Sequence, residues 1–238
     1  MKKKVKLFST IASLCLAVAL MAFGVWAAKT ASVGVTSTIK YTVSGQVQAN
    51  ITIEVKYDTK YVDTNTNTEE LTQCSSNQQD GEETGSTKLC RKWERKQSAG
   101  ENGLNLTGSD ILKLGTYKFN GDAVARKTGA DSQVTNGTQV VYVITIENLS
   151  VNDSLEIEVD DNSTQVDEGS AISRTVTPSQ ALTGEKCVIT KATKAEGSEN
   201  LTTQKFTYTV TYELVNAAKD VDTKGLTFAA VFKLTAKS

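Results

Sequence analysis

The side chains that could do chemistry in this sequence are few, and one absence excludes whole classes of enzyme. The 238 residues include no histidine, which is the commonest general base and the commonest zinc ligand in proteins. Hydrolases that pair a serine or a cysteine with a histidine are therefore excluded within this sequence. It also lacks a phosphate-binding glycine loop, a zinc-ligand spacing and a nucleophile elbow. We expect a protein that is not an enzyme and that needs no cofactor.

Carboxylates are the remaining candidates for chemistry. Asp160 and Asp161, followed by Asp167, could ligate calcium, which prefers oxygen ligands. Their spacing does not match the helix-loop-helix calcium motif, and a solvated acidic turn is the simpler interpretation. A glycosidase would need two carboxylates across a cleft, but such pairs occur by chance in a chain with 27 acidic residues. Calcium at these three aspartates is therefore the only metal site that the sequence offers.

The one basic cluster spans residues 91–96 and contains Trp93, the only tryptophan after the first 27 residues. An exposed aromatic ring beside Arg91 and Arg95 could stack on a sugar or hold a partner. The alternative is an edge strand whose charges discourage pairing with other chains, with Trp93 turned into the core. Trp93, Arg91 and Arg95 are the candidate binding residues.

The cysteine spacing favours one disulfide. Cys74 and Cys90 flank a loop made almost wholly of polar residues and glycine, and closing a loop of this size contributes about 3 kcal/mol to stability. We expect these two residues to pair. Cys187 lies in an apolar run and is expected to be a buried free thiol. Pairing of Cys187 with Cys74 or Cys90 is the alternative.

The first 27 residues have the pattern of an export signal. Four lysines precede a mostly apolar stretch at residues 7–22, and Val25-Trp26-Ala27 suits a signal peptidase that cuts after Ala27. An uncleaved anchor is the alternative, because the apolar stretch extended from residue 7 to residue 28, about 22 residues, could span a bilayer. Cleavage leaves 22 basic and 27 acidic residues, a net charge of −5. We therefore expect no nucleic-acid partner, and contact with a membrane only through this segment before cleavage.

Apolar and polar residues alternate through most of the remaining chain. From Val47 to Tyr57, six apolar residues occupy every second position, which predicts a half-buried strand. Gly45-Gln46 separates it from a similar alternation at residues 39–43, so the two segments are expected to form a hairpin. Further strands are predicted at residues 111–119 with a bulge at Gly115, 140–147 at the centre of a sheet, 155–159, 186–190, 206–214 and 228–234.

Residues 58–110 break this alternation. They are rich in Asp, Asn, Thr, Ser and Gln, which cannot bury enough apolar surface to offset the entropy of ordering. We expect a long polar insertion, with a short hairpin near residues 88–94, inside a single domain that spans residues 28–238. Short strands joined by polar turns predict an all-β fold, an antiparallel sandwich of the jelly-roll or Ig-like type.

Three features of the sequence point to one group of proteins. The signal ends in Phe23-Gly24-Val25-Trp26-Ala27-Ala28 and runs directly into a strand rich in Thr, Ser and Val. The segment Tyr142-Val143-Ile144-Thr145-Ile146-Glu147-Asn148-Leu149-Ser150 and the closing strand at residues 228–234 are the other two. Together they resemble exported bacterial matrix and surface proteins of the TasA and camelysin type. The resemblance implies a jelly-roll-like sandwich that polymerises into matrix fibres, in which an early strand of one subunit completes the sheet of the next.

These observations lead us to expect a secreted structural or adhesive protein at the surface of a bacterial cell or in a biofilm matrix. If residues 28–43 are unpaired in the monomer, their backbone could add to an open sheet edge of another copy. The expected partner is the chain itself, as a homopolymer, or other cell-surface proteins or glycans. The alternative is a carbohydrate-binding module in which Trp93, Tyr117 and Tyr142 stack on sugar rings.

Overall fold

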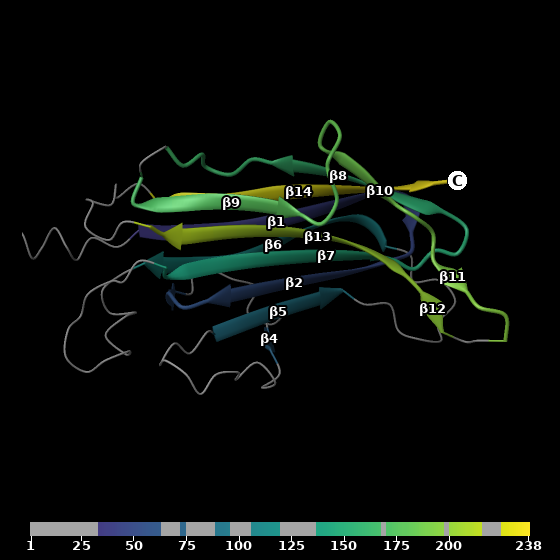
Figure 1. Cartoon of the computed structure of the whole chain (residues 1–238), viewed down its shortest axis with the longest axis horizontal. Coiled ribbons are helices and arrows are strands. Elements are labelled where there is room, and N and C mark those ends of the chain that lie inside the picture. Colours follow the sequence, from purple (N-terminus) through teal and green to yellow (C-terminus); the bar gives the residue numbers. More distant parts are fainter. Residues whose placement is uncertain are drawn as a thin grey trace, which may run out of the picture.

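The computed structural model describes residues 33–62, 72–74, 89–95, 106–119, 137–167, 170–197, 200–215 and 225–238. These residues form strands, turns and bends without any helix, and most of the strands lie in two sheets packed face to face (Figure 1). The predicted all-β sandwich is thereby confirmed. In the same residues, no helix has the length and apolarity needed to cross a membrane. The predicted export signal at residues 1–27 and much of the predicted insertion lie outside the described residues.

Each of the two sheets has six strands. Sheet A has the order β10 (Lys186–Ile189), β8 (Ser154–Asp161), β14 (Leu226–Lys237), β1 (Val33–Val47), β6 (Leu106–Phe119) and β3 (Lys60–Val62). Sheet B has the order β4 (Thr72–Gln73), β5 (Leu89–Arg95), β2 (Ala49–Tyr57), β7 (Gln139–Asn148), β13 (Gln204–Leu214) and β9 (Ile172–Pro178). A separate two-stranded ribbon joins β11 (Thr193–Lys194) to β12 (Leu201–Thr202).

Alternation explains why the strands pack as two layers. Every second residue of β2 and β7 is buried, as is every second residue of β13 after its first two residues, because successive side chains of a strand point to opposite faces of its sheet. β8 and β14 follow the same period through most of their length, so sheet A turns its apolar face toward sheet B. The strands predicted at residues 140–147, 155–159, 186–190, 206–214 and 228–234 are confirmed.

Aromatic side chains from both sheets fill the space between the layers. Tyr142 of β7 contacts Phe228 of β14, with ring centroids 4.6 Å apart, and meets Tyr117 of β6 edge to face at 5.9 Å. Tyr208 of β13 meets Phe232 of β14 at 5.6 Å. All five rings are buried. Because each contact joins a residue of one sheet to a residue of the other, these rings hold the two layers together.

β1 and β2 follow each other in the chain but do not form the predicted hairpin. β1 lies in sheet A between β14 and β6, whereas β2 lies in sheet B between β5 and β7. Only Gln48 separates the two strands, so the chain passes from one layer to the other there. Gly45 has a positive φ of 79°, but the turn falls inside the irregular end of β1, where its pairing with β6 shifts. Alternation shows which residues face inward and does not show which sheet a strand joins.

Part of the predicted polar insertion belongs to the sandwich. β5 pairs with β2 along its whole length, and β6 begins at Leu106 instead of residue 111. The predicted bulge in β6 is confirmed, since Gly115 has a φ of 89° and the register with β1 shifts beside it. The insertion therefore supplies strands to both sheets as well as the segments that lie outside the described residues.

Candidate functional site

Trp93, at the centre of the predicted basic binding cluster, lies in the core. β5 places it opposite Ile53 of β2 on the inner face of sheet B, and only 4% of its surface is exposed. Its ring contacts that of Tyr41 in the other sheet, with centroids 6.3 Å apart. A ring in this position cannot stack on a sugar. The predicted binding role of Trp93 is therefore wrong, and the alternative, an indole turned into the core, is correct.

Arg91 and Arg95 share the inward-facing side of β5 with Trp93, because alternate residues of a strand point the same way. Arg95 is exposed and Arg91 is half-buried. The structure thus brings the three predicted residues to one face, but it leaves the two guanidinium groups without the exposed tryptophan that the predicted site requires.

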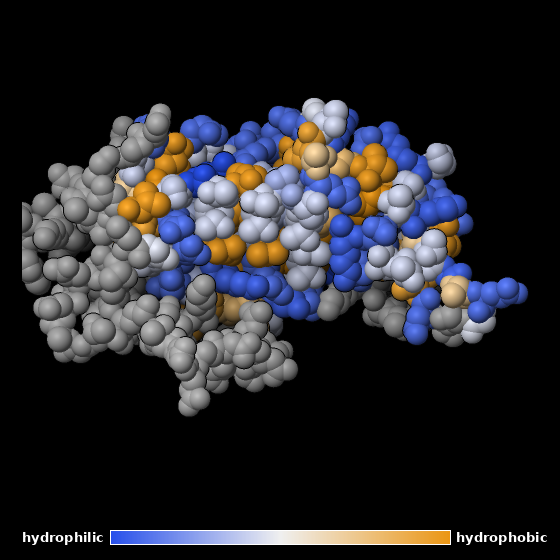
Figure 2. All heavy atoms as spheres, in the orientation of Figure 1, coloured by the Kyte–Doolittle hydropathy of each residue, from blue (hydrophilic) through white to orange (hydrophobic). Residues whose placement is uncertain are grey.

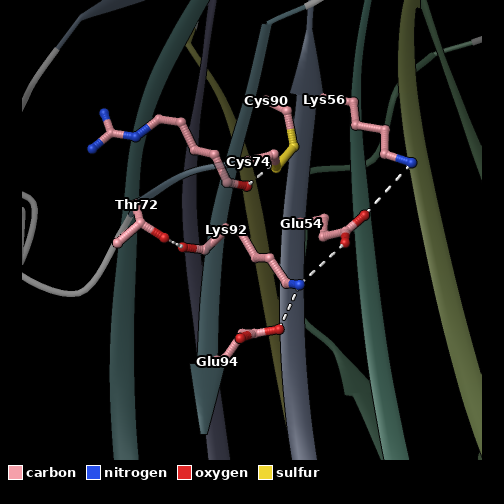
Figure 3. The surroundings of a disulfide bond; sticks show 8 residues. Glu54, Lys56, Thr72, Cys74, Cys90, Lys92 and Glu94 are labelled. Atoms are coloured by element: carbon pink, nitrogen blue, oxygen red, sulfur yellow. Dashed lines mark hydrogen bonds and ion pairs between the residues drawn. A yellow bond between two sulfur atoms is a disulfide. The ribbon is translucent and has the colours of Figure 1, made fainter. Parts of the chain in front are cut away.

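The outward-facing side of β5 carries charges that neutralise one another. The Lys92 ammonium lies 2.5 Å from a carboxylate oxygen of Glu94 and 3.9 Å from one of Glu54 in β2 (Figure 3). Glu54 is also 3.5 Å from the Lys56 ammonium. All four side chains are about one-third exposed, and exposed ion pairs contribute little to stability. This row of charges is therefore a solvated surface with no net excess of positive charge.

A disulfide between Cys74 and Cys90 fastens the edge of sheet B (Figure 3). Beside it, the Cys74 amide donates a hydrogen bond to the Cys90 carbonyl at 3.3 Å, and the Thr72 hydroxyl donates one to the Lys92 carbonyl at 3.3 Å. The pairing predicted from the polar loop between the two cysteines is thereby confirmed. Because β4 has only two residues, the covalent bond holds an edge that few hydrogen bonds could hold alone.

We predict that Cys187 resists alkylation in the folded protein. Its thiol is free and 8% exposed, and burial raises its pKa to about 11, so little reactive thiolate is present at neutral pH. Mass spectrometry of iodoacetamide-treated protein should find this cysteine modified only after denaturation, and unreduced digests should link the peptides of Cys74 and Cys90. Rapid modification of the native protein at Cys187 would contradict the assignment.

The three aspartates predicted as calcium ligands do not converge. Asp160 and Asp161 are neighbours in β8, so their side chains point to opposite faces of sheet A. Asp167 is exposed in the segment that follows. Across the described ranges, no three carboxylate, cysteine or histidine groups lie close enough to hold a metal ion. The predicted calcium site is therefore wrong, because the two-residue period of β8 turns the neighbouring aspartates to opposite faces of the sheet.

Asp161 instead links the two sheets. It follows Leu155, Ile157 and Val159 on the inner face of β8, where it forms an ion pair with Arg174 of β9 in sheet B. The side chains of Arg174 and Asp161 are only 11% and 22% exposed. A charged pair at this depth needs further hydrogen bonds to offset its desolvation.

Those hydrogen bonds come from sheet B and from the segment after β8. The Tyr208 hydroxyl donates to Asp161 Oδ2 at 2.9 Å, and the Ser163 amide donates to Oδ1 at 3.1 Å. Arg174 Nε donates to the Tyr212 hydroxyl at 3.1 Å. Burial alone would raise the pKa of Asp161, but the hydrogen bonds from Ser163, Arg174 and Tyr208 outweigh it and lower the pKa. The carboxylate is thus held in its charged form as a structural bridge.

The aromatic side chains of the core are each at most 8% exposed. Tyr117 and Tyr142, the other two rings predicted to stack on sugars, are each 0% exposed. On the face shown in Figure 2, apolar side chains form separate groups among hydrophilic and neutral residues. Recognition of a sugar through Trp93, Tyr117 and Tyr142 is therefore excluded by their burial.

β1 is the element on which the predicted assembly depends. It pairs parallel with β14, from Val35–Leu226 to Ser44–Thr235, and antiparallel with β6. This is the only parallel pair among the described strands. The inward-facing side chains of β1 are buried in the core: Val35, Ser37, Ile39, Tyr41 and Val47. β1 therefore occupies a central position in sheet A, between two strands that come much later in the chain. We call this position the slot of β1.

No protein-family model matches this chain, and no curated protein matches it.

Proposed function

We propose that this chain is an exported structural subunit of the bacterial cell surface or matrix, which works by assembling with further copies through β1. The observation that carries the proposal is the position of β1, because the first described strand lies between β14 and β6 in the middle of sheet A. The resemblance to matrix proteins of the TasA and camelysin type supports the same role. The burial of the aromatic rings leaves recognition of a sugar by stacking without support.

The mode of assembly differs from the addition of a free strand to an open edge. β1 is paired on both sides within one copy, so the condition that residues 28–43 be unpaired is not met at residues 33–43, and residues 28–32 lie outside the described residues. Assembly through β1 requires that the strand leave its own slot and enter the same slot of another copy. Such an exchange rebuilds identical contacts between chains, which makes it a low-cost route to association.

The connection after β1 offers a hinge for this exchange. Residues 44–46 are exposed, Gly45 has a positive φ, and the register with β6 is interrupted between Val43 and Val47. Backbone angles can change here without uncovering a buried side chain. β2 begins two residues after Val47 and stays in sheet B, so the rest of the sandwich can keep its structure.

Parallel pairing with β14 gives the exchange a direction. Two parallel strands begin at the same end of the sandwich. Because β14 runs to the C-terminus, the start of β1 lies at the end of the sandwich away from the C-terminus (Figure 1). A copy that donates β1 at one end and accepts a strand from a different copy makes head-to-tail contacts. Such contacts continue as a filament unless rotation closes a ring.

A reversible lock on β1 tests the proposal. Thr38 and Ala229 are register partners on strands that lie about 4.8 Å apart, a separation that a disulfide bridges. In a Cys187→Ala background, the Thr38→Cys, Ala229→Cys double variant is oxidised while dilute and then concentrated. We expect a monomer by analytical ultracentrifugation and no filaments by electron microscopy, and polymer formation once the bond is reduced.

The control is the Cys187→Ala chain with neither added cysteine, treated in the same way. It should polymerise with and without the reducing agent, which shows that the Cys74–Cys90 disulfide is not responsible for the effect. Polymers of normal abundance from the oxidised, locked variant would rule out assembly through β1. A control chain that stays monomeric at every concentration would rule out self-assembly itself.

A further inference from the structure

The outer faces of the two sheets differ in charge. Among the described residues of β1, β6, β8, β10 and β14, the outer face of sheet A carries six lysines and three carboxylates: Lys40, Lys113, Lys118, Lys186, Lys233, Lys237, Glu156, Glu158 and Asp160. The outer face of sheet B carries three lysines and four carboxylates: Lys56, Lys92, Lys205, Glu54, Glu94, Glu147 and Glu213. These five strands thus carry a net charge of +3 on the outer face of sheet A, in a chain whose expected mature charge is −5.

The positive excess on sheet A lies on one side of that sheet. Lys186, Lys233 and Lys237 are each within 3.6 Å of a carboxylate oxygen of Glu156 or Glu158 in β8. Lys40 of β1 and Lys113 and Lys118 of β6 form no ion pair with any described residue. We call these three residues the β1–β6 lysine patch.

Strand register places the three lysines along one line. Lys113 pairs with Thr38 and Lys40 with Ile111, so Lys40 and Lys113 are diagonal neighbours about 7–8 Å apart. Lys118 follows five residues along β6, but the bulge at Gly115 takes up one of them, because the partners Thr38 and Gly34 are four residues apart. Lys118 therefore lies roughly 13 Å from Lys113. Its side chain lies over β1, since Lys118 Cγ is 3.7 Å from the position that a Cβ of Gly34 would take. The patch is therefore narrow, extended and sparsely charged.

On the outer face of β1 and β6, the other described side chains beside the three lysines are uncharged. Thr36 and Thr116 hydrogen bond to each other across β1 and β6 at 3.0 Å, and Thr38 is half-buried on the same outer face. Ile111, beside Lys40, is 50% exposed. The threonine hydroxyls can hydrogen bond to the hydroxyls of a sugar. The side chain of Ile111 and the aliphatic parts of the lysine side chains offer an apolar surface to the sugar ring.

From this arrangement we infer that the β1–β6 lysine patch binds a linear anionic polysaccharide whose carboxylates are spaced along its chain. Sparse lysines in a line match a polymer that carries its charge on separate sugar units, because each ammonium can meet a different carboxylate. The inference does not rest on strand exchange, since the patch forms whether β1 comes from the same copy or from another. It would join a structural subunit to the glycan part of a matrix.

Binding to polygalacturonate by the full chain tests this inference, with neutral dextran as the uncharged control. The Lys40→Gln, Lys113→Gln, Lys118→Gln variant should bind polygalacturonate at least about tenfold more weakly than the unaltered chain. A matched variant, Lys56→Gln, Lys92→Gln, Lys205→Gln, makes the same change in net charge on sheet B. These lysines already pair with glutamates, so its affinity should stay within about threefold. Added salt should weaken binding of the unaltered chain.

Four results would overturn the inference. The first two are an equal loss of polygalacturonate affinity in the two triple variants, and binding to dextran as tight as binding to polygalacturonate. The other two are binding to linear polyphosphate but not to polygalacturonate, and a patch variant that loses self-association while its binding to polygalacturonate is unchanged. The last result would assign the patch to contacts between copies. Circular dichroism of both variants, with the β spectrum of the unaltered chain expected, separates loss of binding from loss of fold. Because the readout is polysaccharide affinity, failure here leaves the lock experiment on β1 unaffected.

Discussion

Replacing Phe228 by alanine is expected to lower the free energy of unfolding by about 3–5 kcal/mol, the range for removing a fully buried aromatic side chain. Phe228 of β14 is 0% exposed and lies 4.6 Å from the Tyr142 ring and 6.5 Å from the Tyr212 ring, both in sheet B. Its loss opens a cavity at the interface of the layers, where the surrounding strands are fixed by their ladders and cannot collapse into the gap.

Urea unfolding followed by fluorescence measures this effect, because Trp93 is buried between the sheets and its emission should shift on exposure. Thr175→Ala in β9 is the matched control. Thr175 is exposed on the outer face of sheet B, so its replacement should change the free energy of unfolding by about 1 kcal/mol or less. Equal effects of the two substitutions would contradict a core that lies between two packed sheets.

Replacing Asp161 by alanine is expected to lower the free energy of unfolding by about 2–3 kcal/mol. The substitution leaves Arg174, which is 11% exposed, without its carboxylate partner, and it removes the acceptor of the Tyr208 hydroxyl. Loss of one member of a largely buried ion pair costs more than the pair contributes, because the remaining charge stays desolvated. The double variant Asp161→Ala, Arg174→Met should therefore recover part of the stability that the single variant loses.

The same pair makes stability depend on pH. The pKa of Asp161 is lower in the folded chain than the ordinary value, which is about 3.9 in an unfolded chain. Its contribution is therefore fully present well above this value and is lost as the pH falls from there toward the folded-state pKa. We expect the acid loss of stability to be smaller in the double variant than in the unaltered chain. Parallel acid-unfolding curves for the two proteins would contradict the assigned role of Asp161.

The alternation of apolar and polar residues predicted the two layers of this fold, because the direction in which a strand residue faces depends only on its position within that strand. The residues predicted to face inward from Val47 to Tyr57 are all buried, and the same holds for Phe228, Ala230, Phe232 and Leu234 of β14. Each follows from the two-residue period of a strand and from the low cost of burying its apolar face.

The features that sequence reasoning missed depend on which strands become neighbours. Nothing local to β1 shows that it pairs parallel with β14, almost two hundred residues later. The partner of Asp161 was missed for the same reason, although Arg174 shows a usable signal. It occupies an inward-facing position between Ile172 and Val176, and a charge at such a position indicates a buried partner.

Mixing two single-cysteine chains tests the central claim most directly. One chain carries Thr38→Cys and the other Ala229→Cys, both in the Cys187→Ala background, and the mixture is oxidised after concentration. If β1 of one copy occupies the slot of another, the two residues are register partners and a disulfide should join the two different chains. A mixture in which Ala229→Cys is replaced by Lys233→Cys, four residues out of register with Thr38, should give little of this product. Polymers that form in the mixture without any disulfide between position 38 of one chain and position 229 of another would contradict assembly through β1.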